Sequence, residues 1–172
     1  MNRPALTGIE RLFEPHELIV SKTDDKGRIL YANRVFQRIS GFSERDLRGS
    51  PHNIVRHPDM PRAVFKLLWE TLMQGDEVFA YVINRSRNGD HYWVLAHVTP
   101  SFSPSGTIIG LHSSRRVPER GALAAIEPLY RELAAIEAAN DNRGAGLKAS
   151  FDALMAQLAS TGKSYDEFVL SL

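Results

Sequence analysis

Five short stretches, each bounded by turn residues, have the apolar content and length that are typical of β-strands. Asp24-Asp25-Lys26-Gly27 separates the first two, and Asn88-Gly89, a strong hairpin signal, separates the third and fourth. Pro104-Ser105-Gly106 turns the chain once more before the last stretch. The pattern therefore predicts strands over residues 18–23, 28–32, 77–85, 91–101 and 107–116.

Helical periodicity is clearest over residues 63–74, where Val64, Leu67, Leu68 and Leu72 recur at the 3.6-residue spacing of one helix face. Gly75 is expected to end this helix. Two shorter helices are predicted before it, over residues 33–40 and 43–47. Asn33 and Ser43 supply the side-chain oxygens that cap such helix starts, and Gly41 follows the first of them.

Beyond residue 116 the composition shifts towards Ala, Glu and Leu, and an apolar stripe over residues 119–139 predicts another helix. Pro128 lies inside it, so we expect a kink or a restart there. Residues 140–146 are interpreted as a linker, residues 147–160 as a second amphipathic helix, and Ser164 as the cap of a short last helix. At the other end, Ile9, Leu12 and Phe13 predict one amphipathic turn that packs on a partner.

The element order predicts an α+β fold: a five-stranded antiparallel sheet with short helices inserted between strands 2 and 3, followed by C-terminal helices. We divide the chain into an N-terminal cap (1–17), a sheet domain (18–116) and a helical C-terminal extension (117–172). The inner sheet face and the inserted helices are expected to enclose a pocket, and small ligands often occupy such concavities.

The net charge and the length of the chain argue against some classes of function. The chain has 172 residues and a formal net charge of +1 with interspersed signs, which argues against binding to nucleic acid or to an anionic membrane. No apolar run approaches the roughly 20 residues of a membrane-spanning helix, and no signal-peptide pattern precedes the first strand. We therefore expect a cytoplasmic protein without membrane insertion.

Candidate chemistry is sparse. The absence of cysteine excludes disulfides, thiolate metal sites and light sensing through a cysteinyl adduct. The six histidines lack the helical spacing of a zinc site, and no glycine-rich phosphate or dinucleotide fingerprint is present. No catalytic constellation stands out, so the residues favour a ligand-binding or interaction domain over an enzyme.

The stretch Pro51-His52-Asn53-Ile54-Val55-Arg56-His57-Pro58-Asp59-Met60-Pro61 concentrates polar chemistry immediately before the clearest helix. Its three prolines predict a stiff loop, since proline fixes φ and restricts the residue before it. A rigid polar loop at a helix start can hold an anionic or amide-rich ligand. The alternative is a structural turn with solvated polar groups.

These motifs resemble those of PAS sensor domains. More specifically, Pro51–Pro61 (PHNIVRHPDMP), Phe65, Trp69, Asn84-Arg85 and Asn88–Val94 (NGDHYWV) resemble the flavin-binding PAS domain of bacterial aerotaxis receptors. The resemblance spans residues 18–132 and includes Glu127-Pro128-Leu129-Tyr130.

This resemblance implies a domain that binds FAD non-covalently, senses redox state or oxygen, and relays the flavin redox state to a signalling protein partner. It also implies the flavin-pocket residues. Phe65 and Trp69 would contact the isoalloxazine ring, Asn84 would bond its polar edge, and Arg56 and His57 would meet the phosphate or adenine part. The full set is Asn33, Arg56, His57, Asp59, Phe65, Trp69 and Asn84.

Three alternatives stay open: a haem-binding or other small-ligand PAS sensor, a cofactor-free PAS dimerisation module, and a flavin-dependent enzyme. Haem needs an axial ligand, usually a histidine, and the helix over residues 63–74 has none. Aerotaxis receptors continue into a membrane segment, a HAMP domain and a methyl-accepting region. This chain ends at Leu172, so we expect either a stand-alone relative or a fragment of a longer receptor.

The helices of residues 120–172 are expected to pack on something, because short amphipathic helices are unstable alone in water. They could pack on the outer sheet face, on a second copy of the chain or on a partner protein. We expect these helices to form a cap within a homodimer, and we expect this cap to be the place where the redox change is read out. Deletion of residues 140–172 should then leave flavin binding intact and change the oligomeric state or the solubility.

Overall fold

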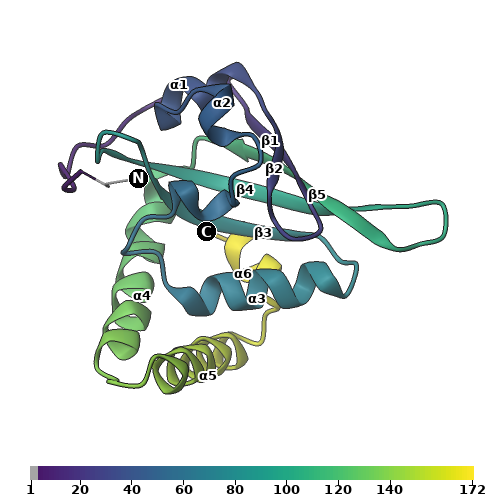
Figure 1. The fold of residues 1–172 in the computed structure, drawn as a ribbon. Coiled ribbons are helices and arrows are strands. Elements are labelled where there is room, and N and C mark those ends of the chain that lie inside the picture. Colours follow the sequence, from purple (N-terminus) through teal and green to yellow (C-terminus); the bar gives the residue numbers. More distant parts are fainter. Residues whose placement is uncertain (1–3) are drawn as a thin grey trace.

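The computed structural model describes residues 4–172 and shows one antiparallel sheet with helices on both of its faces (Figure 1). The strands lie in the order β2-β1-β5-β4-β3, so the N-terminal hairpin pairs through β1 with the last strand of the meander. The predicted α+β class and the insertion of helices between the second and third strands are confirmed. The elements are β1 (Ile19–Asp24), β2 (Ile29–Ala32), α1 (Arg34–Ser40), α2 (Glu44–Leu47), the 3₁₀ helix η1 (His52–Val55), α3 (Arg62–Met73), β3 (Val78–Arg85), β4 (His91–Phe102), β5 (Ile108–Arg116), α4 (Arg120–Ala138), α5 (Arg143–Thr161) and α6 (Tyr165–Leu170).

The short inserted helices begin where their capping residues predict. The Asn33 side chain accepts the backbone N–H of Phe36 at the start of α1, and Gly41 ends that helix with φ 70°. Ser43 and Asp46 form a reciprocal capping box at α2. Local hydrogen bonding, which the sequence carries, therefore sets these boundaries.

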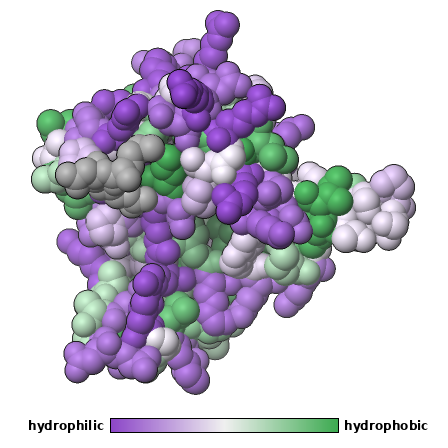
Figure 2. All heavy atoms as spheres, in the orientation of Figure 1, coloured by the Kyte–Doolittle hydropathy of each residue, from purple (hydrophilic) through white to green (hydrophobic). Residues whose placement is uncertain are grey.

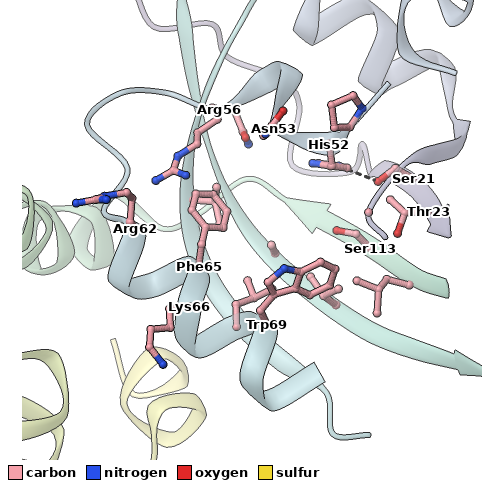
Figure 3. A pocket seen from close by; sticks show the side chains of 18 of the residues that line it. Ser21, Thr23, His52, Asn53, Arg56, Arg62, Phe65, Lys66, Trp69 and Ser113 are labelled. Atoms are coloured by element: carbon pink, nitrogen blue, oxygen red, sulfur yellow. Dashed lines mark hydrogen bonds between the residues drawn. The ribbon is translucent and has the colours of Figure 1, made fainter. Parts of the chain in front are cut away.

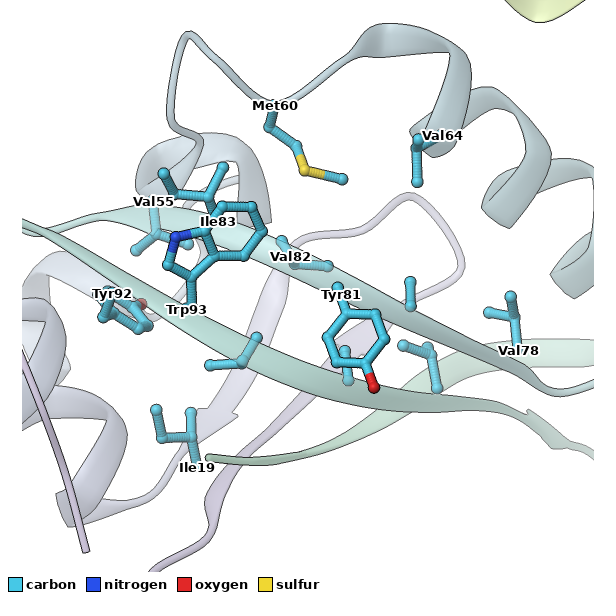
Figure 4. Close-up of a cluster of buried hydrophobic side chains, with 14 of the residues drawn as sticks. Ile19, Val55, Met60, Val64, Val78, Tyr81, Val82, Ile83, Tyr92 and Trp93 are labelled. Atoms are coloured by element: carbon cyan, nitrogen blue, oxygen red, sulfur yellow. The ribbon is translucent and has the colours of Figure 1, made fainter. Parts of the chain in front are cut away.

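The core lies between the sheet and the inserted segments. Met60 and Val64, from the loop and from α3, lie over the sheet, and both are almost fully buried (Figure 4). Ile19 of β1 and Phe36 of α1 have no exposed surface. Helix α3 thus packs against β3 and β4, and other residues of the same helix, from Arg62 to Glu70, line a cavity.

The N-terminal segment is extended, so the predicted amphipathic turn is wrong. Its backbone pairs with the β3–β4 hairpin, with Thr7 N–H donating to the Gly89 carbonyl at 3.1 Å and His91 N–H donating to the Ile9 carbonyl at 2.9 Å. Gly89 is needed here because a Cβ would lie 2.0 Å from a backbone oxygen of Ala5. Strand-like pairing overrides the apolar spacing on which the turn was based. Residues 1–3 of the proposed cap lie outside the described residues.

Helix α4 covers the outer face of the sheet. The Tyr130 hydroxyl donates to the Tyr81 carbonyl at 2.6 Å, and the Tyr130 ring lies 6.1 Å from the Trp93 ring. Tyr81 and Trp93 alternate with the inward-facing residues of β3 and β4, so they belong to the face opposite the cavity. The expected burial of this outer face thus occurs within the chain.

Helix α5 packs against α4, and α6 lies against β3 (Figure 1). β3 is an edge strand, and its Phe79 N–H donates to the Asp166 carboxylate of α6 at 2.9 Å. This contact satisfies a group that an open edge would present to another chain. Helix α5 packs beside α3, where the Lys66 ammonium lies 4.1 Å from the centre of the Phe151 ring.

Two expectations for the extension need correction. The predicted restart at Pro128 does not occur, because α4 runs through it as one helix, and the alternative of a kink stays a prediction. Pro128 and Ala124 are both exposed, so water can satisfy the carbonyl that loses its N–H partner. The linker is also shorter than predicted, because residues 143–146 already belong to α5, whose cap is the Asn142 side chain.

Polar residues dominate the face seen in Figure 2, from which the β4–β5 hairpin projects. Within residues 4–172, no helix combines the length and the apolar character that crossing a membrane requires.

The hydrogen bond from the Tyr130 hydroxyl to the Tyr81 carbonyl is expected to stabilise the packing of α4 on the sheet. Tyr130→Phe removes a buried donor and leaves the Tyr81 carbonyl without it, so we expect a loss of about 1–2 kcal/mol in the free energy of unfolding. Urea denaturation followed by circular dichroism measures this loss. Tyr31→Phe, at a position 50% exposed, is the matched control and should change little. Equal stability of the two variants would contradict the assigned role of Tyr130.

Candidate ligand-binding site

A cavity of about 740 Å³ lies between α3, the Pro51–Pro61 loop and the inner face of the sheet (Figure 3). Its volume is within the range of small-molecule and cofactor sites. The predicted enclosure of a pocket by the sheet and the inserted helices is therefore confirmed. The lining includes Ser21, Thr23, Lys26, His52, Asn53, Arg56, Arg62, Phe65, Lys66, Leu68, Trp69, Val82, Asn84, Ala96, Val98, Leu111, Ser113, Arg115, Arg143 and Leu147.

The Pro51–Pro61 loop is tied to the sheet at both ends of η1. The His52 N–H donates to the Gly27 carbonyl at 2.9 Å, in the turn between β1 and β2. Arg56 forms an antiparallel bridge with Asn84 of β3. Pro61 then stands directly before α3. The predicted stiff loop thus holds the start of α3 at a set distance from the sheet.

Aromatic side chains of α3 form one wall. Phe65 and Trp69 are four residues apart and both line the cavity, as their spacing on one helix face predicts (Figure 3). The Arg56 guanidinium lies over the Phe65 ring, 4.7 Å from its centre. Trp69 is 41% exposed, so a planar ligand in the cavity would bury indole surface that is now open.

Asn84 places an unsatisfied amide in the opposite wall. Its side chain is only 4% exposed, and its Nδ2 has no hydrogen-bond partner within residues 4–172. A buried donor without an acceptor costs about 1–3 kcal/mol. A ligand that offers a carbonyl or ring-nitrogen acceptor would remove this cost.

A buried cation, Arg115, occupies the part of the sheet wall near the loop. Its Nη2 donates to Ser21 Oγ and, at 3.1 Å, to His52 Nε2, and its Nε donates to Ser113 Oγ at 3.0 Å. Its guanidinium also lies over Phe36, 4.7 Å from the ring centre. No carboxylate of the described chain forms an ion pair with it.

Burial lowers the pKa of Arg115 to about 10, so the guanidinium still carries its charge at neutral pH. Burial and the neighbouring Arg115 charge lower the pKa of His52 to about 3. His52 is therefore neutral, and its Nε2 acts as an acceptor towards Arg115. The wall combines one positive charge with neutral hydrogen-bonding groups, which suits an anionic or strongly polar ligand edge.

The structure brings Arg56, Phe65, Trp69 and Asn84 together along the cavity, but the other three predicted site residues are not in its lining. Asn33 uses its amide to cap α1 and to accept the Val20 N–H at 3.1 Å. His57 is buried, and its Nδ1 accepts the Asp59 N–H at 3.2 Å. The Asp59 side chain is 73% exposed. Their contacts shape α1 and the loop, and their contact with a cofactor stays a prediction.

Several lining residues were not predicted. Leu111, Ser113 and Arg115 are every second residue of β5 and therefore lie on the same face of the strand. Strand periodicity could have identified Ser113 and Arg115 as inward-facing. Arg143 and Leu147 had no local signal, because their place in the lining depends on how α5 returns to α3.

Residues 4–172 contain no cluster of three or more His, Asp or Glu side chains that could hold a metal ion. An aromatic wall, a polar sheet wall and several cations instead favour an organic ligand with a planar ring and an anionic part.

Comparisons with known proteins agree with this architecture. The chain is 44% identical over 115 residues to the Aerotaxis receptor of Escherichia coli (strain K12), a match that covers 67% of this chain and 22% of the receptor. It is 30% identical over 97 residues to the Nitrogen fixation regulatory protein of Klebsiella oxytoca, covering 56% of this chain and 20% of that protein. The chain thus spans about a fifth of the length of these relatives.

Solved structures show the same fold. The blue-light photoreceptor Aureochrome1 LOV in its dark state has a TM-score of 0.55 at 22% identity, covering 69% of this chain and 86% of that chain. The PAS domain of a protein from Colwellia psychrerythraea has a TM-score of 0.50 at 17% identity, with 59% and 86% covered. The family model for the PAS fold matches residues 19–113, and the chain therefore belongs to the PAS family.

Proposed function

We propose that this protein is a non-enzymatic PAS sensor that binds FAD and relays its redox state to a signalling protein partner. The observation that carries the proposal is the pairing of an open indole, Trp69, with a buried unsatisfied amide, Asn84, across the cavity. A planar heterocycle with acceptor atoms at its edge suits both groups. The similarity to the Aerotaxis receptor supports a flavin as that heterocycle.

When bound, FAD would supply a ring that accepts and returns electrons. The chain's own residues would hold it: Phe65 and Trp69 would pack on the ring, and the Asn84 amide would donate to its edge. Arg115 would place a positive charge in the sheet wall of the cavity. Arg56 would lie towards the phosphates, since it lines the other end of the cavity.

Haem is a weaker candidate on this geometry. Among the histidines of the described chain, only His52 lines the cavity, and its Nε2 already accepts from Arg115 and lies 3.2 Å from Ser21 Oγ. Iron coordination by Nε2 would break this contact and leave the guanidinium with fewer acceptors.

Signal relay by a cytoplasmic homodimer also belongs to the proposal. Relatives of this chain are receptors and regulators several times its length, so the partner's identity and the behaviour of those whole proteins are not carried over. The structure describes a single chain, and the homodimer stays a prediction.

The aromatic wall can be tested directly. The purified protein should show the blue absorption band of a flavin, and the pigment released by denaturation should co-migrate with FAD. Trp69→Ala should weaken flavin binding roughly tenfold or more, because it removes ring contact and stacking. Titration of apo-protein with FAD measures this change. Met73→Ala lies one turn further on, at a position 47% exposed and outside the lining, and should bind normally.

A colourless wild-type protein that fails to take up added FAD would overturn the proposed function. A Soret band in place of the flavin band would point to haem.

The charge of Arg115 predicts an effect on redox potential. An electron added to the bound ring by a one-electron reductant adds negative charge, which the uncompensated guanidinium stabilises. Arg115→Gln should therefore lower the midpoint potential, by about 60 mV for each tenfold loss of preference for the reduced form. Spectroelectrochemical titration measures it. Arg116→Gln, an exposed neighbour, is the control. Equal potentials in both variants would exclude Arg115 from this role.

A further inference from the structure

Three arginines meet at the end of the cavity farthest from His52 and Ser21. Arg56 comes from the loop, Arg62 is the first residue of α3, and Arg143 is the first residue of α5. Figure 3 shows Arg56 and Arg62 at this end, with Phe65 and Trp69 between them and the polar sheet wall. Burial lowers the pKa of Arg56, and the positive charges of Arg62 and Arg143 act in the same direction, against the opposing charge of Glu137.

Positive charge exceeds negative charge at this end. Glu137 accepts from Arg62 Nε at 2.8 Å and from the Ala63 N–H at 3.0 Å, and within residues 4–172 it is the one carboxylate that pairs with any of these arginines. Arg56 has neutral partners, the Met60 carbonyl at 3.3 Å and the Phe65 ring. An anion with several oxygens would find unused donors here.

Helix α5 is held in place at this end by close contacts. The Arg143 carbonyl accepts from Arg62 Nη1 at 3.0 Å, and Leu147, one turn further on, lines the cavity. Gly146 permits the close crossing with α4, because a Cβ there would lie 2.7 Å from the Glu137 carbonyl oxygen. The extension is therefore part of the cavity wall.

We propose that Arg56, Arg62 and Arg143 form the binding site for the diphosphate of a flavin dinucleotide, so that the C-terminal extension completes the cofactor site. This inference rests on the proposed function and deepens it. The ring would lie between α3 and the sheet, and the diphosphate would lie at the cationic end. Deletion of residues 140–172, expected from sequence to leave flavin binding intact, should instead weaken FAD binding.

The test compares FAD with riboflavin, which has the same ring and no phosphate. Full-length apo-protein and variants are titrated with each ligand, with flavin fluorescence as the readout. Wild-type protein should bind FAD at least tenfold more tightly than riboflavin, and added salt should reduce this preference. Arg143→Gln should weaken FAD binding about tenfold and leave riboflavin binding unchanged. Arg131→Gln, an exposed arginine of α4 outside the lining, is the matched control.

A second pair of variants tests the position of α5 without a change of charge. Gly146→Ala should force α5 away from α4 and reduce the preference for FAD over riboflavin. Gly121→Ala places its Cβ where nothing lies within 4 Å, and it should keep that preference. Circular dichroism confirms that both variants fold.

The outcomes separate the two proposals. If wild-type protein binds riboflavin and FAD equally well, or if Arg143→Gln leaves FAD affinity unchanged, the diphosphate site is overturned while the flavin-binding function stands. If wild-type protein binds neither ligand, the proposed function fails and this inference fails with it.

Discussion

The structure depends on how the Pro51–Pro61 loop separates α3 from the sheet. Residues on α3 must bury an apolar face, and without a spacer they would collapse onto the strands and fill the cavity. Backbone contacts at both ends of η1, to Gly27 in the β1–β2 turn and to Asn84 of β3, fix the loop to opposite sides of the sheet. Val64 and Leu72 are fully buried, whereas Phe65 and Trp69 face the cavity. One helix thus serves both the core and the ligand site.

The sheet wall of the cavity contains buried polar groups that are not fully paired, and their burial lowers the stability of the fold. Among residues 4–172, the Asn84 amide lacks an acceptor and Arg115 has no carboxylate partner. Burial and Arg115 hold the pKa of His52 low. Replacement of such groups by apolar residues would often stabilise a fold of this kind. Their position along the cavity, where a ligand could pair with them, is the observation that the proposed ligand binding would explain.

Local signals predicted most of the fold. The cap residues Asn33 and Ser43, the Asn88-Gly89 turn and the 3.6-residue period before Gly75 act through neighbouring residues, so sequence alone reveals them. The N-terminal segment was predicted wrongly because its extended form depends on pairing with a hairpin some 80 positions away in sequence. The i, i+4 spacing, in contrast, is a local signal, and it correctly predicted the shared face of Phe65 and Trp69.

The parts of the site that were not predicted come from tertiary contacts. The family resemblance assigned His57 and Asp59 to the pocket. In the fold His57 is buried within the loop and the Asp59 side chain is exposed, and their contact with a cofactor stays a prediction. Arg115 follows from strand alternation once β5 is placed in the sheet. No rule of spacing predicts Arg143, because its place in the cavity wall depends on the return of α5 to α3.

The extension connects the two faces of the sheet without passing through it. Tyr130 in the middle of α4 contacts Tyr81 and Trp93 on the outer face, and Glu137 near the end of the same helix binds the first turn of α3 beside the cavity. Under the proposed function, a charge change or a displacement at the cationic end would reach α4 through the bonds of Glu137 to Arg62 and Ala63. Allosteric relay needs an element that both sites can bias. In this protein α4 could meet that condition, since one helix contacts the outer sheet face and, through Glu137, the first turn of α3, which lines the cavity.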